Sequence, residues 1–291
     1  LTRIETINPN PSVTVYAKLE GNNPGGAVTD RIALFMIEAA EREGRLTRDK
    51  IILEATSGNT GIGLAMVAVA KKYRVKLTMP ACVSVERRKI LEAFGAELIL
   101  SPSEEGTDGA IRAAHRIMSE NPDKYFMPNQ FDNISNVMAH YETTGREIFD
   151  QTSGAVTHFV AGMGTSGTLM GAGRRLKEFN KAIKIIGAEP ILGHRIQGLK
   201  NMSESIVPKI FDPSVLDERY IVNDEEAFDT TRMLAVKEGI FCGMSSGAAM
   251  YIALRKSSEL NKGTIVVVLP DRGDRYLSTA LFTSVCAKCP P

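Results

Sequence analysis

Alternating strand-like and helix-like segments are the feature that most narrows the folds open to this chain. Apolar runs of strand length recur along the first half, and each is followed by apolar residues at helical spacing. The pairs are 50–55 with 60–72, 75–80 with 84–94, and 97–100 with 107–119. Strands that alternate with helices in this way form parallel sheets covered by helices. The sequence therefore predicts an α/β protein with doubly wound, mostly parallel sheets.

The same pattern starts again in the second half, with a buried strand at 157–161 and further strands near 183–189 and 264–269. A single long helix is predicted over 134–150. We therefore expect two α/β domains with a ligand between them, since ligands bind beyond the carboxyl ends of parallel strands. The expected division is a smaller, mobile domain over 23–133 and a larger one made of 1–22 plus 134–291.

Composition and charge exclude several classes of partner. The net charge is +1 over 291 residues, which gives no field for nucleic acid or an anionic membrane. No apolar run approaches the roughly 18 residues of a membrane span. The chain begins with Leu1 and shows no signal-peptide pattern, as a chain clipped at its start would. We expect a cytoplasmic protein without nucleic-acid or membrane partners.

The four cysteines are too few and too scattered for a disulfide framework, which favours a reducing compartment. Cys82 and Cys242 have apolar neighbours, and we expect both to be packed inside. Cys286 and Cys289 form a C-x-x-C near the end of the chain. Without a second pair or nearby histidines this is half a zinc site at best. We interpret it as an incidental tail and expect no metal site.

Three turns rich in glycine and hydroxyl groups lie where strands meet helices. The first follows the strand Ile-Ile-Leu-Glu-Ala and covers Thr56 to Gly61. Hydroxyls and unpaired N–H groups at a helix start form an anion site, although simple helix capping explains the same residues. The second turn, Gly162 to Thr168, has the composition of a phosphate site. It also fits the G-x-G-x-x-G spacing with Glu189 beyond it, so a nicotinamide enzyme is an alternative.

The third turn, Gly243 to Gly247, repeats the pattern with two serines at a helix start. Three such turns in different parts of the sheets predict a ligand that carries both a phosphate and a carboxylate. An amino acid joined to pyridoxal phosphate is such a ligand.

Four stretches carry a resemblance to a known family. They are Thr56–Gly61 (TSGNTG), Gly164–Thr168 (GTSGT), Gly243–Gly247 (GMSSG) and Asp271–Ser278 (DRGDRYLS). In this order and approximate spacing they are similar to the cysteine synthases, and the last resembles the B-type isozyme more than the A-type. The chain thus resembles an O-acetylserine sulfhydrylase, a fold-type-II pyridoxal phosphate enzyme with tryptophan synthase β-like architecture, over essentially its full length. This resemblance displaces the nicotinamide alternative.

The resemblance implies a reaction, a cofactor and a set of site residues. The reaction is β-replacement on O-acetylserine or O-phosphoserine by sulfide or another sulfur donor to give cysteine, carried out by a homodimer. Lys200 could pair with the phosphate of O-phosphoserine, or could be a solvated loop residue. The implied cofactor-binding residues are Asn59, Gly164, Thr165, Ser166, Gly167, Thr168 and Ser245. The implied binding residues for the substrate carboxylate are Thr56, Ser57, Thr60 and Gln130, and a surface role for Gln130 is the weaker alternative.

One position departs from the family pattern. Thr29 stands where these enzymes have the lysine that forms the Schiff base, and Ala27 replaces the usual serine. A threonine hydroxyl cannot form an imine and is a poor general base near neutral pH. The chain is then an altered form of an active enzyme, a natural homologue that binds without turnover, or a sequence in which a modified lysine is misreported. A cystathionine β-synthase-like activity is the enzymatic alternative.

Overall fold

The computed structural model describes residues 1–56, 58–203 and 206–282. Ser57, Cys286 and Cys289 lie outside the described residues. By its internal contacts the chain forms two compact units. Unit 1 contains Leu1–Val28 and Asn136–Asp274, and unit 2 contains Thr29–Ser135 together with residues from 275 onward. The compact units divide the chain after Val28, Ser135 and Asp274, and the domain boundaries expected from the sequence at 22/23 and 133/134 stay a prediction.

Unit 1 is built on a six-stranded sheet whose strand order is β1-β2-β10-β7-β8-β9. Only the β1–β2 pair is antiparallel, and the other pairings are parallel. β10 pairs with both β2 and β7, and its sequence Thr-Ile-Val-Val-Val-Leu suits a strand covered on both faces. The strands are β1 (Thr2–Ile4), β2 (Val13–Leu19), β7 (His158–Gly162), β8 (Lys184–Pro190), β9 (Glu218–Val222) and β10 (Gly263–Leu269).

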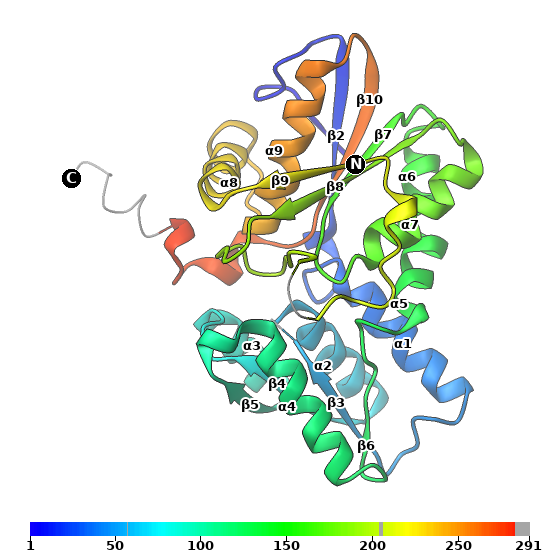
Figure 1. Cartoon of the computed structure of the whole chain (residues 1–291), viewed down its shortest axis with the longest axis vertical. Coiled ribbons are helices and arrows are strands. Elements are labelled where there is room, and N and C mark those ends of the chain that lie inside the picture. The colour runs from blue at the N-terminus through cyan, green and yellow to red at the C-terminus, as the bar shows by residue number, and fades with distance from the viewer. Residues whose placement is uncertain (57, 204–205, 283–291) are drawn as a thin grey trace, which may run out of the picture. The chain divides into compact units, whose positions relative to one another are not determined.

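Helices cover both faces of this sheet (Figure 1). One face carries α6 (Gly145–Gln151) and α7 (Gly167–Phe179), and the other carries α8 (Asp224–Glu238) and α9 (Met244–Glu259). The helix expected over 134–150 is interrupted, because α5 (Ile134–Ala139) passes into a π-helical turn at His140–Thr144 before α6 begins. The short 3₁₀ segments are Glu20–Asn22, Ser103–Glu105, Pro213–Val215 and Gly273–Tyr276.

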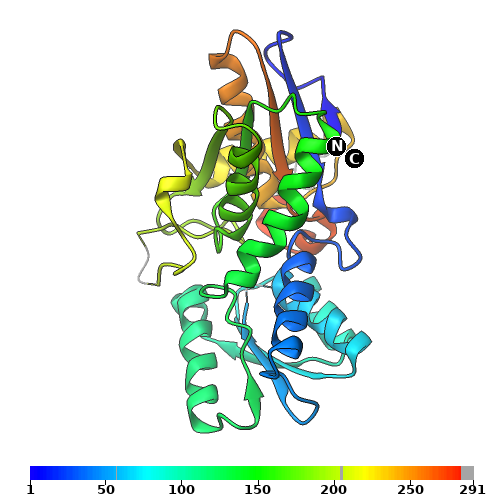
Figure 2. The ribbon, with the colours of Figure 1, turned by 90° about the vertical axis from the view of Figure 1, so that its right-hand side faces the viewer.

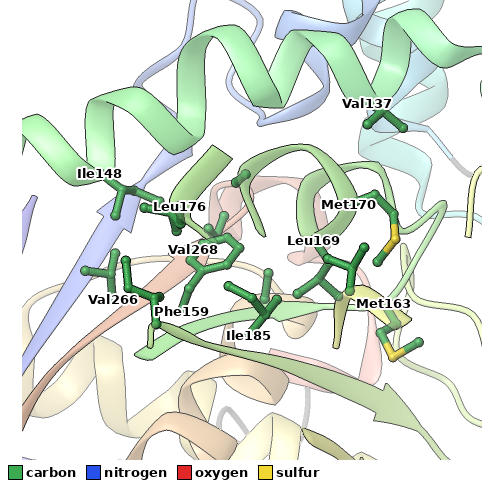
Figure 3. Packing of buried hydrophobic residues seen from close by; sticks show 14 of the residues in the cluster. Val137, Ile148, Phe159, Met163, Leu169, Met170, Leu176, Ile185, Val266 and Val268 are labelled. Carbon is green, nitrogen blue, oxygen red and sulfur yellow. The ribbon is translucent and has the colours of Figure 1, made fainter. Parts of the chain in front are cut away.

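The main core of unit 1 fills the space between the sheet and the helices α5, α6 and α7. Its side chains come from alternate positions of the strands and from the apolar stripe of each helix, so both surfaces lose contact with water together. Figure 3 shows this layer, which includes Phe159, Ile185, Val266, Ile148, Leu169 and Leu176.

Unit 2 contains a four-stranded parallel sheet with the order β5-β4-β3-β6. The helix α4 lies along one face of this sheet, and α1 and α2 lie on the other (Figure 2). The strands are β3 (Ile51–Ala55), β4 (Arg74–Pro80), β5 (Glu97–Ser101) and β6 (Tyr125–Phe126), and the helices are α1 (Thr29–Arg42), α2 (Asn59–Lys71), α3 (Val85–Ala93) and α4 (Gly106–Glu120).

Parallel pairing brings the polar turns of each unit to one edge of its sheet. In unit 2, β3 and β6 are parallel neighbours, so the Thr56 turn and the loop with Gln130 both follow carboxyl ends of strands. In unit 1, β7 ends at Gly162, and the residues after β10 pair with the turn before α9 through the Cys242–Arg272 bridge.

Two further features bear on the sequence expectations. Cys82 is exposed, so the expectation that it is packed inside is wrong, whereas Cys242 is buried. The reason is position, because Cys82 lies two residues beyond the end of β4, in a turn. Within the described ranges, no helix is both long and apolar enough to cross a membrane.

Candidate cofactor and substrate sites

The turn after β3 is closed by the buried side chain of Thr56. Its Oγ1 accepts hydrogen bonds from the backbone nitrogens of Gly58 at 2.9 Å and Gly61 at 3.2 Å. Gly58 has a φ of +134°, and a Cβ on it would lie 2.3 Å from Cδ of Arg87. Both the backbone conformation and the lack of space therefore require glycine at this position. Thr56 thus ties the end of β3 to the start of α2.

Gln130 is buried and joins this turn to the loop after β6, so the weaker alternative of a surface role is wrong. The hydroxyl of Thr60 donates to Gln130 Oε1 at 2.7 Å. Gln130 Nε2 in turn donates to the carbonyl of Ala55 at 2.8 Å. Three segments of unit 2, the end of β3, the first turn of α2 and the 128–133 loop, are thus joined by side-chain hydrogen bonds.

Glu54 binds the backbone of Gln130 and is a residue that the sequence did not single out. Its carboxyl oxygens accept hydrogen bonds from the backbone nitrogens of Asn129 at 2.6 Å and Gln130 at 3.3 Å. Asn129 has a positive φ of 52°, which these bonds help to hold. Burial raises the pKa of Glu54 to about 8, against the lowering effect of the backbone hydrogen bonds. A glutamate inside the apolar run Ile-Ile-Leu-Glu-Ala was the signal available in the sequence.

Asn59 is oriented by the segment near the end of the described chain. Arg275 Nη1 donates to Asn59 Oδ1 at 2.6 Å. Arg87, which lies against Gly58, stacks over the ring of Tyr276 with 4.5 Å between its Cζ and the ring centroid and donates to the Tyr276 hydroxyl. The Asp271–Ser278 stretch was identified in the sequence only as a motif. In the structure, Arg275 contacts Asn59 and Tyr276 contacts Arg87 within unit 2.

The turn between β7 and α7 in unit 1 presents donors without internal partners. The backbone nitrogens of Thr165, Ser166 and Thr168 have no hydrogen-bond acceptor among the described residues. Ser166 has a left-handed backbone with φ 69°, and its buried Oγ also lacks a partner in the described part of the chain. A Cβ on Gly164 would lie 2.6 Å from the carbonyl oxygen of Gly198, so no larger residue fits there.

These features fit the phosphate of pyridoxal phosphate. Buried polar groups without a partner cost free energy, and an anion with several acceptor oxygens satisfies a cluster of N–H and O–H donors at once. The donors also lie at the N-terminus of α7, where the helix dipole favours negative charge. Gly164 to Thr168 therefore form a turn suited to a phosphate group, which we call the phosphate turn.

Ser245 lies in the first turn of α9 and is buried. The residues just before it pair with those after β10, which places this turn at the same edge of the six-stranded sheet as the phosphate turn. A Cβ on Gly247 would lie 2.0 Å from the carbonyl oxygen of Ala227, so α9 starts in close contact with α8. The nearby Cys242 thiol has its pKa raised to about 12 by burial and is therefore a packed, unreactive group.

Thr29 is the first residue of α1, and its Oγ1 is buried without a hydrogen-bond partner among the described residues. Lys18 offers no replacement amine, because its Nζ lies 2.7 Å from Glu147 Oε2 and 3.6 Å from Glu20 Oε1 in unit 1. Removing this lysine from its carboxylates would leave buried charges unpaired.

The loop after β8 is tied back to the end of that strand by Glu189. This carboxylate accepts from the backbone nitrogen of Met202 at 2.7 Å and pairs with Arg219 Nε at 3.1 Å. Glu189 therefore fixes a loop, whereas the nicotinamide alternative required it to bind a ribose. Lys200, in the same loop, is buried, so its interpretation as a solvated residue is wrong, and its backbone nitrogen donates to the Met163 carbonyl at 2.8 Å.

The structure thus gathers the expected residues into two groups, each described within its own unit. Unit 2 brings together Thr56, Asn59, Thr60 and Gln130. Unit 1 brings the phosphate turn and Ser245 to one sheet edge. Ser57 lies outside the described residues.

Comparison with known proteins gives a family and several relatives. The model of the family described as pyridoxal-phosphate dependent enzyme matches residues 1–271. The chain is 49% identical over 276 residues to a cysteine synthase of Aquifex aeolicus, across 93% of this chain and 84% of that protein. It is 46% identical over 282 residues to cysteine synthase B of Salmonella typhimurium, across 97% and 92% respectively. A crystal structure of the Entamoeba histolytica cysteine synthase matches with a TM-score of 0.89 at 39% identity, covering 97% of this chain and 87% of that one.

Proposed function

We propose, from the premise that this chain belongs to the family of pyridoxal-phosphate dependent enzymes, that it is a scaffold for β-replacement on an activated serine. The resemblance to cysteine synthases, the B-type included, is confirmed by the relatives, and so are the α/β fold and the pyridoxal phosphate cofactor. The chain is a cysteine-synthase-like enzyme of this cofactor class. The finer proposal is that it takes O-acetylserine or O-phosphoserine and sulfide, or another sulfur donor, to give cysteine as a homodimer.

The observation that carries the proposal is the hydrogen-bonded pair of Thr60 and Gln130 at the turn after β3. A substrate amino acid brings a carboxylate, which accepts several hydrogen bonds at once. The helix start at Asn59, the hydroxyl of Thr56 and the second Nε2 hydrogen of Gln130 supply donors of the right kind, and Thr60 holds Gln130 in place. Because Thr56 already holds the backbone of Gly58 and Gly61, little ordering of these two residues is needed when the carboxylate binds.

The phosphate turn and Ser245 complete the proposed binding set in unit 1. Bound pyridoxal phosphate supplies an electron sink that allows the α-proton and then the β-substituent of an amino acid to leave. The phosphate turn would bind the cofactor's phosphate through its unpaired N–H groups. Ser245 would place a neutral hydroxyl at the ring nitrogen, and a neutral partner suits β-elimination and replacement better than transamination.

Thr29 would then limit what the scaffold does. A primary amine at this position would hold the cofactor covalently and accept the α-proton, a contribution of about 10² to 10⁴ in rate. The Thr29 hydroxyl does neither. We propose that the chain with Thr29 binds cofactor and amino acid but does not turn over at a useful rate.

Replacing Thr29 by lysine tests the proposal directly. Thr29→Lys should retain the cofactor after borohydride treatment, and the cofactor should be attached to the peptide that contains residue 29. The same variant should convert O-acetylserine and sulfide to cysteine. Thr29→Met is the matched control, since methionine has nearly the length of lysine but no amine. It should bind cofactor without covalent retention.

Four outcomes would change the conclusion. Covalent retention by the unaltered chain would show that residue 29 is not the attachment position or is a modified lysine. Retention by Thr29→Lys without cysteine formation would favour a binding homologue, and consumption of homocysteine in place of sulfide would favour a cystathionine β-synthase-like activity. A monomer in sedimentation would remove the homodimer from the proposal.

A further inference from the structure

Hydrogen bonds connect the helical segment 134–144 to both threonines of the phosphate turn. Asn136 Nδ2 donates to Thr165 Oγ1 at 3.0 Å, and His140 Nε2 lies 3.2 Å from Thr168 Oγ1. The other ring nitrogen, His140 Nδ1, lies 2.9 Å from the hydroxyl of Thr144. Asn136 and His140 are both buried, so these bonds form out of reach of water, where polar interactions are stronger.

Close backbone packing fixes the geometry of these contacts. A Cβ on Gly167 would lie 1.9 Å from Asn136 Oδ1, and one on Gly171 would lie 2.1 Å from the Val137 carbonyl oxygen. The first turns of α7 therefore lie directly on the 134–144 segment. His140 also begins the π-helical turn, and such turns are frequent at functional sites.

The direction of each threonine proton follows from what its oxygen already accepts. Thr165 Oγ1 accepts from Asn136 Nδ2, which can only donate, and from the Gly167 nitrogen at 3.4 Å. A hydroxyl oxygen accepts two hydrogen bonds and donates one, so the Thr165 proton must point to a different acceptor. If His140 carries its proton on Nε2, that nitrogen donates to Thr168 Oγ1, and the Thr168 proton must likewise point to a different acceptor. Nδ1 of His140 then accepts from the Thr144 hydroxyl.

We propose that Asn136 and His140 are positioning residues that direct the hydroxyl protons of Thr165 and Thr168 to the cofactor's phosphate. His140 then carries its proton on Nε2. The inference rests on the proposed function, because it takes the phosphate turn as the anion site. An independent sign of a ligand there is the Oγ of Ser166, which is buried in the same turn without a partner among the described residues.

The test uses binding, because the chain with Thr29 holds the cofactor without a covalent bond. Calorimetric titration with pyridoxal phosphate and with pyridoxal, which lacks the phosphate, isolates the contribution of the phosphate. His140→Leu should weaken pyridoxal phosphate binding by about three- to tenfold, the size of one oriented hydrogen bond, and leave pyridoxal unchanged. His140→Gln, whose amide can donate from nearly the same place, should restore most of the affinity.

A double-mutant cycle separates positioning from general damage to the fold. If His140 acts through Thr168, His140→Leu should cause no further loss in a Thr168→Val chain. Asn136→Leu, which is similar in size but uncharged and unable to donate, should likewise lose its effect beside Thr165→Val. Thr152→Val is the matched control, since its buried hydroxyl bonds the Ile148 carbonyl elsewhere in unit 1.

The outcomes distinguish a failure of the proposed phosphate site from a failure of the positioning role. If the unaltered chain binds both compounds equally, the proposed phosphate site is wrong. A second outcome is that the unaltered chain prefers pyridoxal phosphate while His140→Leu weakens binding equally in the Thr168 chain and in the Thr168→Val chain. In that case the phosphate site stands and the positioning role is overturned. Nitrogen-15 NMR of the cofactor-loaded chain gives a further decision, because a proton on His140 Nδ1 would contradict the proposal even if His140→Leu fails to fold.

Discussion

Replacing Glu54 by glutamine should change how the stability of the protein depends on pH. The folded chain holds the pKa of Glu54 at about 8 by burial, whereas an exposed glutamate has a value of 4.5. As pH rises from about 4.5 to about 8, the unfolded chain releases this proton and the folded chain keeps it, so the native protein loses stability. Glutamine has no proton to release, and the Glu54→Gln chain lacks this loss.

The magnitude follows from the two pKa values. Between pH 5 and pH 7 the free energy of unfolding of the native chain should fall by about 2.5 kcal/mol relative to Glu54→Gln. A pH-independent loss of about 1 to 2 kcal/mol should accompany the substitution, because a glutamine amide can accept from only one of the Asn129 and Gln130 nitrogens.

Urea denaturation at pH 5, 6 and 7 measures the difference between the two chains at each pH. Glu92→Gln is the matched control, since it removes an exposed carboxyl group from α3 in the same unit. A Glu54→Gln difference that stays constant across this range would refute the inference that Glu54 is held protonated by burial.

Three other substitutions have definite expected results. Gly167→Ala should destabilise the chain by at least about 2 kcal/mol in urea denaturation, because the new methyl group would lie 1.9 Å from Asn136 Oδ1. Asn223→Ala should cost about 1 kcal/mol by removing the capping box of α8, with cofactor affinity unchanged in calorimetry. Thr60→Val should weaken L-serine binding to the cofactor-loaded chain by about tenfold, and an unchanged affinity would argue against a carboxylate site at this turn.

Much of the fold could be predicted because its signals are local. The run Ile51–Ala55 and the apolar spacing that follows are visible in the sequence, and β3 and α2 form there. The interruption at His140–Thr144 was not predictable, because the segment contains no proline or glycine and the π turn depends on packing against α7. Cys82 was misplaced for a related reason, since apolar neighbours in sequence do not show that the chain is leaving the sheet.

The candidate site divides in the same way. The sequence by itself determined the three turns and the threonine at position 29, because glycine and hydroxyl residues at strand–helix junctions are a local pattern. Only the tertiary structure decided that Glu54 supports Gln130, that Arg275 orients Asn59 and that His140 lies behind Thr168. Each of these contacts joins residues far apart in the chain, and their pairing depends on strand order and helix packing, which no local pattern encodes.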